Sequence, residues 1–114
     1  MDINKIIELQ KNFDSQHKGK FHWDEKISEE HLEMLNFLMI ALMGEVGEAA
    51  NIVKKINRGD FSLLDQKDYI EEEVVDIFIY VIKLAYQLDM DIEQAYINKM
   101  EKNTDRFKEY EQKR

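Results

Sequence analysis

The sequence predicts an all-α fold, a four-helix bundle in a single domain over residues 1–114. Apolar residues recur at spacings of three and four in four segments, as in helices with one buried face. Proline is absent and only four glycines occur, which suits long uninterrupted helices. No strand pattern competes with this periodicity. We therefore expect four helices with antiparallel neighbours.

The first predicted helix covers about residues 2–13 and is followed by a loop. Three apolar side chains share one side of this helix: Ile6, Leu9 and Phe13. Residues 14–27 break the pattern. This loop is polar and carries the aromatic pair His22 and Trp23, so we expect it either to order over a bound ligand or to pack Trp23 statically on the bundle.

The second predicted helix begins after Ser28, its expected N-cap, and extends to about Asn57. Gly59 is the expected left-handed cap that ends it. The helix carries an unbroken apolar seam of eight residues: Leu32, Leu35, Met39, Leu42, Val46, Ala49, Val53 and Ile56.

The third predicted helix covers about residues 64–88, and Asp91 caps the fourth, with Gln94 in position for a capping box. The third helix has its own apolar seam: Ile70, Val74, Ile77, Val81, Leu84 and Leu88. The fourth carries four spaced apolar residues: Ile92, Tyr96, Met100 and Phe107.

The second and third helices also carry a second apolar side. Its members are Phe37, Met43, Val75, Phe78 and Ile82. A lone chain of this size has too few helices to cover both sides, so we expect a homodimer or homotetramer whose core crosses the subunit boundary. The alternative is that the short first helix covers the surplus.

Composition excludes several classes of partner. The net charge of −8 argues against nucleic acid, because phosphate binding needs a basic face. The absence of cysteine excludes disulfides and Cys-based zinc sites. No segment resembles a leader, and the most apolar run, residues 37–43, is far shorter than a bilayer span. We therefore expect a cytoplasmic protein without membrane contact.

Two acidic pairs carry the chemistry that the sequence predicts. Glu45 and Glu48 are three residues apart on the second helix, as are Glu73 and Asp76 on the third, so each pair shares a helix face. Asp76 lies in an otherwise apolar run with no Lys or Arg on the same face within one turn. Four carboxylates on neighbouring helices suit a hard cation such as Mg²⁺, and Glu-x-x-His pairs typical of di-iron bundles do not occur.

Magnesium implies a phosphate ligand, and the fourth helix offers groups that bind one. The spacing there places cationic and amide side chains on or beside one face: Lys99, Lys102, Asn103 and Arg106. For any single lysine a solvated surface role is the better interpretation. As a set in an acidic protein, these residues are candidate phosphate ligands.

Three motifs in order resemble the MazG-type all-α nucleotide pyrophosphohydrolases. GEVGEAANIVKK, with Glu45 and Glu48, resembles the first family motif, and EEEVVDIFIYVIKLAYQLDMDIEQA, with Glu73 and Asp76, resembles the second. KMEKNTDRF resembles the C-terminal K-x-x-x-N-x-x-R-F element. The likeness covers about residues 32–107.

The resemblance implies Mg²⁺-dependent hydrolysis of nucleoside triphosphates, often deoxynucleoside triphosphates, to monophosphate and pyrophosphate. It implies that the four carboxylates hold Mg²⁺ and are catalytic, in dimers or tetramers with sites near subunit boundaries. Tyr80 matches a position that contacts nucleotide in the dCTP-hydrolysing branch, and His22 and Trp23 loosely resemble that branch's N-terminal His and Trp. Lys55 stands where that branch has a tryptophan.

Our mechanistic hypothesis is attack on the α-phosphorus by a water that Mg²⁺ makes more acidic, with Lys102 and Arg106 on the outer phosphates. Glu72, a neighbouring carboxylate and metal hydroxide all stay open as the base. The rival enzymes are a phosphoribosyl-ATP pyrophosphatase and a dimeric dUTPase, and the rival of another class is a non-enzymatic helical oligomeric adaptor. House-cleaning of the nucleotide pool is the expected role.

Overall fold

The computed structural model describes residues 1–17 and 24–110, and its regular elements are all helical. They are α1 (Ile3–Gln16), α2 (Glu33–Arg58), α3 (Leu63–Gln87), α4 (Ile92–Arg106) and the short 3-10 helix η1 (Lys108–Tyr110). In the described ranges the only β-type pairing is one isolated bridge. The all-α prediction and its four helices are confirmed.

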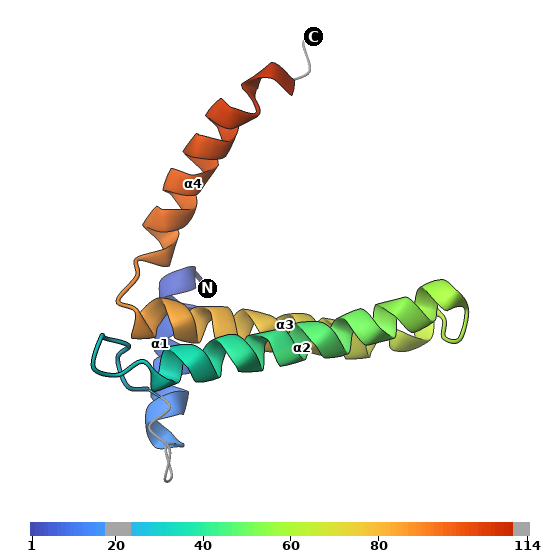
Figure 1. Ribbon diagram of the computed structural model, residues 1–114, viewed down its shortest axis with the longest axis horizontal. Coiled ribbons are helices and arrows are strands. Elements are labelled where there is room, and N and C mark those ends of the chain that lie inside the picture. The colour runs from blue at the N-terminus through green and yellow to red at the C-terminus, as the bar shows by residue number, and fades with distance from the viewer. Residues whose placement is uncertain (18–23, 111–114) are drawn as a thin grey trace.

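The two longest helices, α2 and α3, form an antiparallel hairpin that is the body of the molecule (Figure 1). Gly59 ends α2 in the left-handed region, with φ at 92°, as its position after the apolar seam predicted. Ser62 begins α3, because its hydroxyl accepts a hydrogen bond of 3.1 Å from the backbone N–H of Asp65. This tight connection places the middle of α2 beside the middle of α3.

The well-buried core lies at the open end of the hairpin, where α1 crosses it (Figure 1). Met34 and Leu38 of α2 pack there with Ile82 and Ala85 of α3. The predicted seam of α2 was therefore wrong in this half. Met39 is 46% exposed, because the crossing of α1 and α3 selects the Met34–Leu38 face.

The remainder of the predicted seams is only partly covered. Val53 on α2 and Val74 and Leu88 on α3 are all exposed large hydrophobic residues. The second apolar side is also largely uncovered, with Met43, Val75 and Phe78 exposed, whereas Ile82 is buried. The first helix thus covers one end of the surplus apolar surface and leaves the rest open.

Two predicted boundaries were wrong. Ser28 does not cap α2, which begins five residues later at Glu33, because Ser28 and His31 pair with each other through backbone hydrogen bonds of 2.9 and 3.3 Å. The first helix continues beyond Phe13 to Gln16, and Asp14, expected in the loop, is helical and buried. The burial of Asp14 against α3 accounts for the longer helix.

Helix α4 begins as predicted and then leaves the body of the molecule. Asp91 caps it by accepting a hydrogen bond of 3.1 Å from the backbone N–H of Gln94. Figure 1 shows α4 projecting from the hairpin, and its packing is chiefly against η1. The Cα radius of gyration is accordingly 17.8 Å, whereas a compact chain of this length has about 13 Å.

Candidate active site

Three acidic side chains from the two long helices converge at the middle of the hairpin. Glu45 of α2 meets Glu73 and Asp76 of α3, and one carboxylate oxygen from each lies within 4.8 Å of those of the others. The helical spacing explains the convergence, since residues three apart share a face and the hairpin turns the two faces toward each other. We call Glu45, Glu73 and Asp76 the carboxylate cluster.

The carboxylate cluster concentrates negative charge. The pKa of Glu45 is raised from 4.5 to about 7, first by its hydrogen bond with Glu73, then by desolvation and by the charges of Glu73, Glu48 and Asp76. None of the ion pairs between residues of the described ranges involves the cluster. In the described ranges no basic side chain therefore pairs with the cluster, so a proton or a bound cation would relieve its repulsion.

Glu73 is the member whose environment favours a cation. It is 6% exposed, and its Oε2 atom is buried without a hydrogen-bond partner. An unpaired buried carboxylate oxygen is costly, so it indicates a missing ligand. Three convergent carboxylates are the donor set that a hard divalent cation prefers. The residues present thus fit the magnesium site expected from the sequence.

Glu48, the fourth predicted ligand, lies beside the cluster and is not one of its three members. Its charge reaches the site, because it contributes to the raised pKa values of Glu45 and Tyr69. Glu48 is exposed, whereas Glu73 is buried. The structure therefore brings three of the four predicted carboxylates together and places the fourth at their edge.

Two tyrosines border the carboxylate cluster. The pKa of Tyr80, a predicted nucleotide contact, is raised by desolvation and then by the charges of Glu45 and Asp76, so its hydroxyl group is close enough to sense both charges. The pKa of Tyr69 is raised by desolvation and then by the charges of Glu73 and Glu48, with a hydrogen bond to Glu73 adding to the effect. Sequence reasoning missed Tyr69, although its position four residues before Glu73 on one helix was a usable signal.

The candidate base Glu72 lies on the outer side of the site. A surface hollow of about 620 Å³ is lined there by Asp68, Glu71, Glu72, Val75 and Asp76. Asp76 thus belongs both to the carboxylate cluster and to this acidic hollow.

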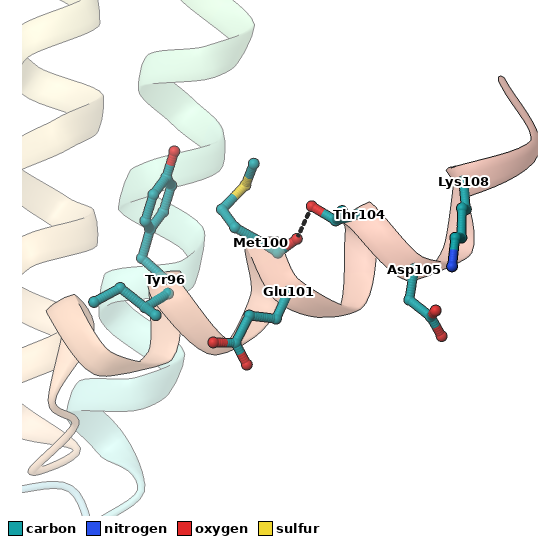
Figure 2. Close-up of a pocket in the computed structure, with 7 residues that line it drawn as sticks. Tyr96, Met100, Glu101, Thr104, Asp105 and Lys108 are labelled. Atoms are coloured by element: carbon teal, nitrogen blue, oxygen red, sulfur yellow. Dashed lines mark hydrogen bonds between the residues drawn. The ribbon is translucent and has the colours of Figure 1, made fainter. Parts of the chain in front are cut away.

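The predicted phosphate ligands are not brought to the carboxylate cluster within one chain. Lys99, Lys102, Asn103 and Arg106 all lie on α4, which projects away from the hairpin (Figure 1). Figure 2 shows a hollow beside this helix, with Tyr96 and Met100 on one side of α4 and Glu101 and Asp105 on another. The predicted base contacts His22 and Trp23 lie outside the described residues, as do residues 18–21 of the expected lid.

Comparison with known proteins places this site in a family. The family model for the MazG nucleotide pyrophosphohydrolase domain matches residues 27–110. The Gene 37 protein of Mycobacterium phage L5 is 38% identical over 80 residues, which are 66% of this chain and 70% of that protein. No solved structure gave a significant match.

Mammalian relatives carry a functional name. The dCTP pyrophosphatase 1 of Mus musculus is 35% identical over 74 residues, and that of Rattus norvegicus is 31% identical over the same length. In each case the match covers 61% of this chain and 44% of the relative, so the chain spans less than half the length of these enzymes. With the family model matching most of its length, including the carboxylate cluster, the chain belongs to the MazG nucleotide pyrophosphohydrolase family.

Proposed function

We propose that the protein hydrolyses nucleoside triphosphates, preferentially deoxynucleoside triphosphates, to monophosphate and pyrophosphate in the presence of Mg²⁺. The carboxylate cluster with the unpartnered Glu73 oxygen carries this proposal. Family membership and the relatives named dCTP pyrophosphatase support the reaction class. We further propose a cytoplasmic role in removing unwanted nucleotides from the pool.

Glu45, Glu73 and Asp76 would hold the ion, and Glu48 adds negative charge from the edge. When bound at this cluster, Mg²⁺ would neutralise charge on the phosphate groups and would lower the pKa of a water molecule bound to it. The chain's own contribution is to fix three carboxylates at one point and to offer the half-buried Tyr80 ring as a surface for the base. The Tyr80 hydroxyl is protonated at neutral pH and able to donate a hydrogen bond.

The phosphate groups need cations, and we propose that α4 of a second copy supplies them. Lys99, Lys102 and Arg106 are exposed on a helix that packs little against its own chain. A triphosphate beside the acidic cluster of one subunit would be held at its outer phosphates by these side chains of the other. The site is then complete only in the homodimer or homotetramer.

The surface area of the chain supports this assembly. The chain exposes 9087 Å², whereas a compact monomer of this mass exposes about 6,600 Å². The excess of roughly 2,500 Å² exceeds the approximately 800 Å² that each partner contributes to a standard interface. The uncovered apolar residues lie on both long helices and on α4, for example Met43, Phe78 and Met100.

A protein partner explains this surface better than a bilayer does. By length and composition alone α2 is apolar enough to cross a membrane, a test that core helices of soluble proteins also pass. Glu45 and Glu48 lie in the middle of that helix, and an acidic side chain at the bilayer centre costs about 2.5–3.5 kcal/mol. We therefore assign the apolar surface to a second copy.

The decisive experiment is pyrophosphate release from a panel of nucleotides with and without Mg²⁺. The panel holds the canonical ribo- and deoxynucleoside triphosphates, several damaged forms, dUTP and phosphoribosyl-ATP. Turnover confined to dUTP or phosphoribosyl-ATP would favour one of those two hydrolases. No turnover, with no Mg²⁺ binding by calorimetry, would overturn the proposal in favour of a non-enzymatic helical adaptor.

Matched variants separate the site from the fold. Glu73→Gln should abolish turnover, since Glu73 is the buried member of the carboxylate cluster. Glu71→Gln, two residues earlier on the same helix, removes an exposed acid paired with Lys67 at 3.0 Å and should leave turnover within about twofold. Equal loss in both variants would contradict the assignment of the cluster.

A further inference from the structure

A buried ion pair joins α1 to α3 outside the carboxylate cluster. Asp14 is 2% exposed, and its Oδ1 atom lies 3.4 Å from Nζ of Lys83, whose side chain is 14% exposed. The same carboxylate accepts hydrogen bonds from Gln10, at 2.9 Å, and from the hydroxyl of Tyr86. With these partners on two helices, Asp14 holds the ammonium group of Lys83 in one place.

That ammonium group also faces the ring of Tyr80. Nζ of Lys83 lies 5.7 Å from the Tyr80 ring centroid, within the range of about 6 Å in which a cation attracts an aromatic face. Asp76, Tyr80 and Lys83 follow one another at spacings of four and three, so they line one face of α3. Tyr80 therefore stands between the Asp14–Lys83 pair and the carboxylate cluster.

A purely structural role explains this pair poorly. Taking two charges out of water costs about as much as their attraction returns, so a buried ion pair is weak evidence for stability. Its geometry does something that an apolar pair would not, because it directs a cation onto one ring beside the candidate active site.

We propose that Lys83, anchored by Asp14, is a positioning residue that fixes the Tyr80 ring to receive the nucleotide base. This inference rests on the proposed function, in which Tyr80 contacts substrate. A fixed ring face binds a stacked base without first losing rotational freedom. The pair thus acts on substrate affinity through Tyr80, while the carboxylate cluster acts on the reaction itself.

The first test separates affinity from turnover. Lys83→Met keeps most of the length of the side chain and removes its charge, and it should raise KM for the preferred nucleotide about tenfold while kcat changes less than about threefold. Lys83→Arg retains a cation over the ring and should restore KM to within about threefold of wild type. Lys67→Met, an exposed lysine of α3, is the matched control and should leave both constants unchanged.

A second variant covers the case in which Lys83→Met fails to fold because Asp14 keeps a buried, uncompensated charge. The pair Asp14→Asn with Lys83→Met removes both charges and should fold, with the same rise in KM. A folded double variant with wild-type KM would overturn the proposal.

A double-variant experiment tests whether Lys83 acts through Tyr80. In a Tyr80→Ala background, Lys83→Met should produce no further rise in KM, because the ring through which it acts is absent. Additive effects of the two substitutions would overturn the positioning role.

A readout without substrate keeps this proposal separate from the proposed function. Aromatic NMR of the ligand-free protein should show the Tyr80 ring signals, identified by their loss in Tyr80→Phe, shifting in Lys83→Met while those of Tyr69 stay in place. Unchanged Tyr80 signals would overturn the inference. If the signals shift but the wild-type protein hydrolyses no nucleotide, the proposed function fails and the Lys83–Tyr80 coupling stands.

Discussion

Removing the charge of Glu73 should stabilise the metal-free protein at neutral pH. In most proteins, altering a side chain that is 6% exposed costs stability. Here the buried carboxylate has one unpartnered oxygen and faces Glu45 and Asp76. Glu73→Gln replaces a charged group by a neutral one of the same shape, so it removes repulsion and leaves the packing intact.

The size of the effect follows from the pKa of Glu45, which is raised from 4.5 to about 7 chiefly through Glu73. Because the folded form binds a proton that the unfolded form releases, the contribution to stability is full below pH 4.5 and is lost as pH rises to 7. Taken at face value the shift equals about 3 kcal/mol. Glu45 is only half-buried, so solvent screening reduces this to roughly 1 kcal/mol.

The assay is thermal unfolding in EDTA at pH 5 and pH 8, followed by circular dichroism. The wild-type protein should lose roughly 1 kcal/mol between these pH values, a fall of about 5 °C in Tm, and Glu73→Gln should lose much less. At pH 8 the variant should therefore melt higher than the wild type. Glu71→Gln, which removes an exposed acid, should follow the wild-type curve.

Magnesium should reverse the order at pH 8. An ion that binds only the folded state adds about 2.7 kcal/mol at a hundred times its dissociation constant, and the wild type alone keeps the full carboxylate cluster. A Glu73→Gln variant that is less stable than wild type in EDTA at pH 8 would refute the reasoning, as would a wild-type Tm that is equal at pH 5 and pH 8.

Four further outcomes are expected. Asp76→Asn should be as stable as wild type in EDTA while pyrophosphate release falls by orders of magnitude; a less stable but active variant would contradict its place in the site. Gly47→Ala should stabilise α2 by about 1 kcal/mol, because the added methyl meets no atom within 4 Å; an unchanged or lower Tm would contradict this. Met100→Glu should yield monomers in sedimentation, and an intact oligomer would exclude this face of α4. Trp23 fluorescence should change with deoxynucleotide and Mg²⁺, and a constant signal would remove the lid hypothesis.

The features predictable from the sequence were those set by spacing along one helix. Glu73 and Asp76 had to share a face because they are three residues apart, and Gly59 and Asp91 marked helix ends because their backbone and side-chain chemistry suits those positions. The pairing of Glu45 with Glu73 needed only one further assumption, that consecutive helices are antiparallel neighbours.

The Asp14 network could not be predicted in this way. Asp14 and Tyr86 are 72 residues apart, and their contact depends on the angle at which α1 crosses the hairpin. The sequence showed only an acid at the start of a polar stretch, which is the pattern of a surface loop. The same crossing decided which apolar face of α2 became the core, so Met34 and Leu38 replaced the predicted Met39.

The position of α4 relative to the hairpin could not be predicted from the sequence for a different reason. Periodicity shows that Tyr96 and Met100 share an apolar face. The same spacing occurs whether such a face is buried within one chain or against another copy, so it does not distinguish the two cases. The structure leaves Tyr96 65% exposed and keeps the α4 cations away from the carboxylate cluster. What the sequence predicted as one bundle is therefore divided between a hairpin with the acids and a helix with the cations.

The middle of α2 contains two features that each lower the stability of the fold: glycines inside a helix and a carboxylate beside other carboxylates. Gly44 and Gly47 weaken the helix by about 1 kcal/mol apiece relative to alanine, and Glu45 between them faces two other carboxylates. Neither cost is recovered within the chain. A side chain at either glycine would meet no atom within 4 Å, and an oxygen of Glu73 lacks a partner. A thin helix surface beside concentrated negative charge gains free energy only when something approaches closely and carries positive charge. The Mg²⁺ ion that we propose for this cluster would bring the positive charge, and the triphosphate bound to it would make the close approach.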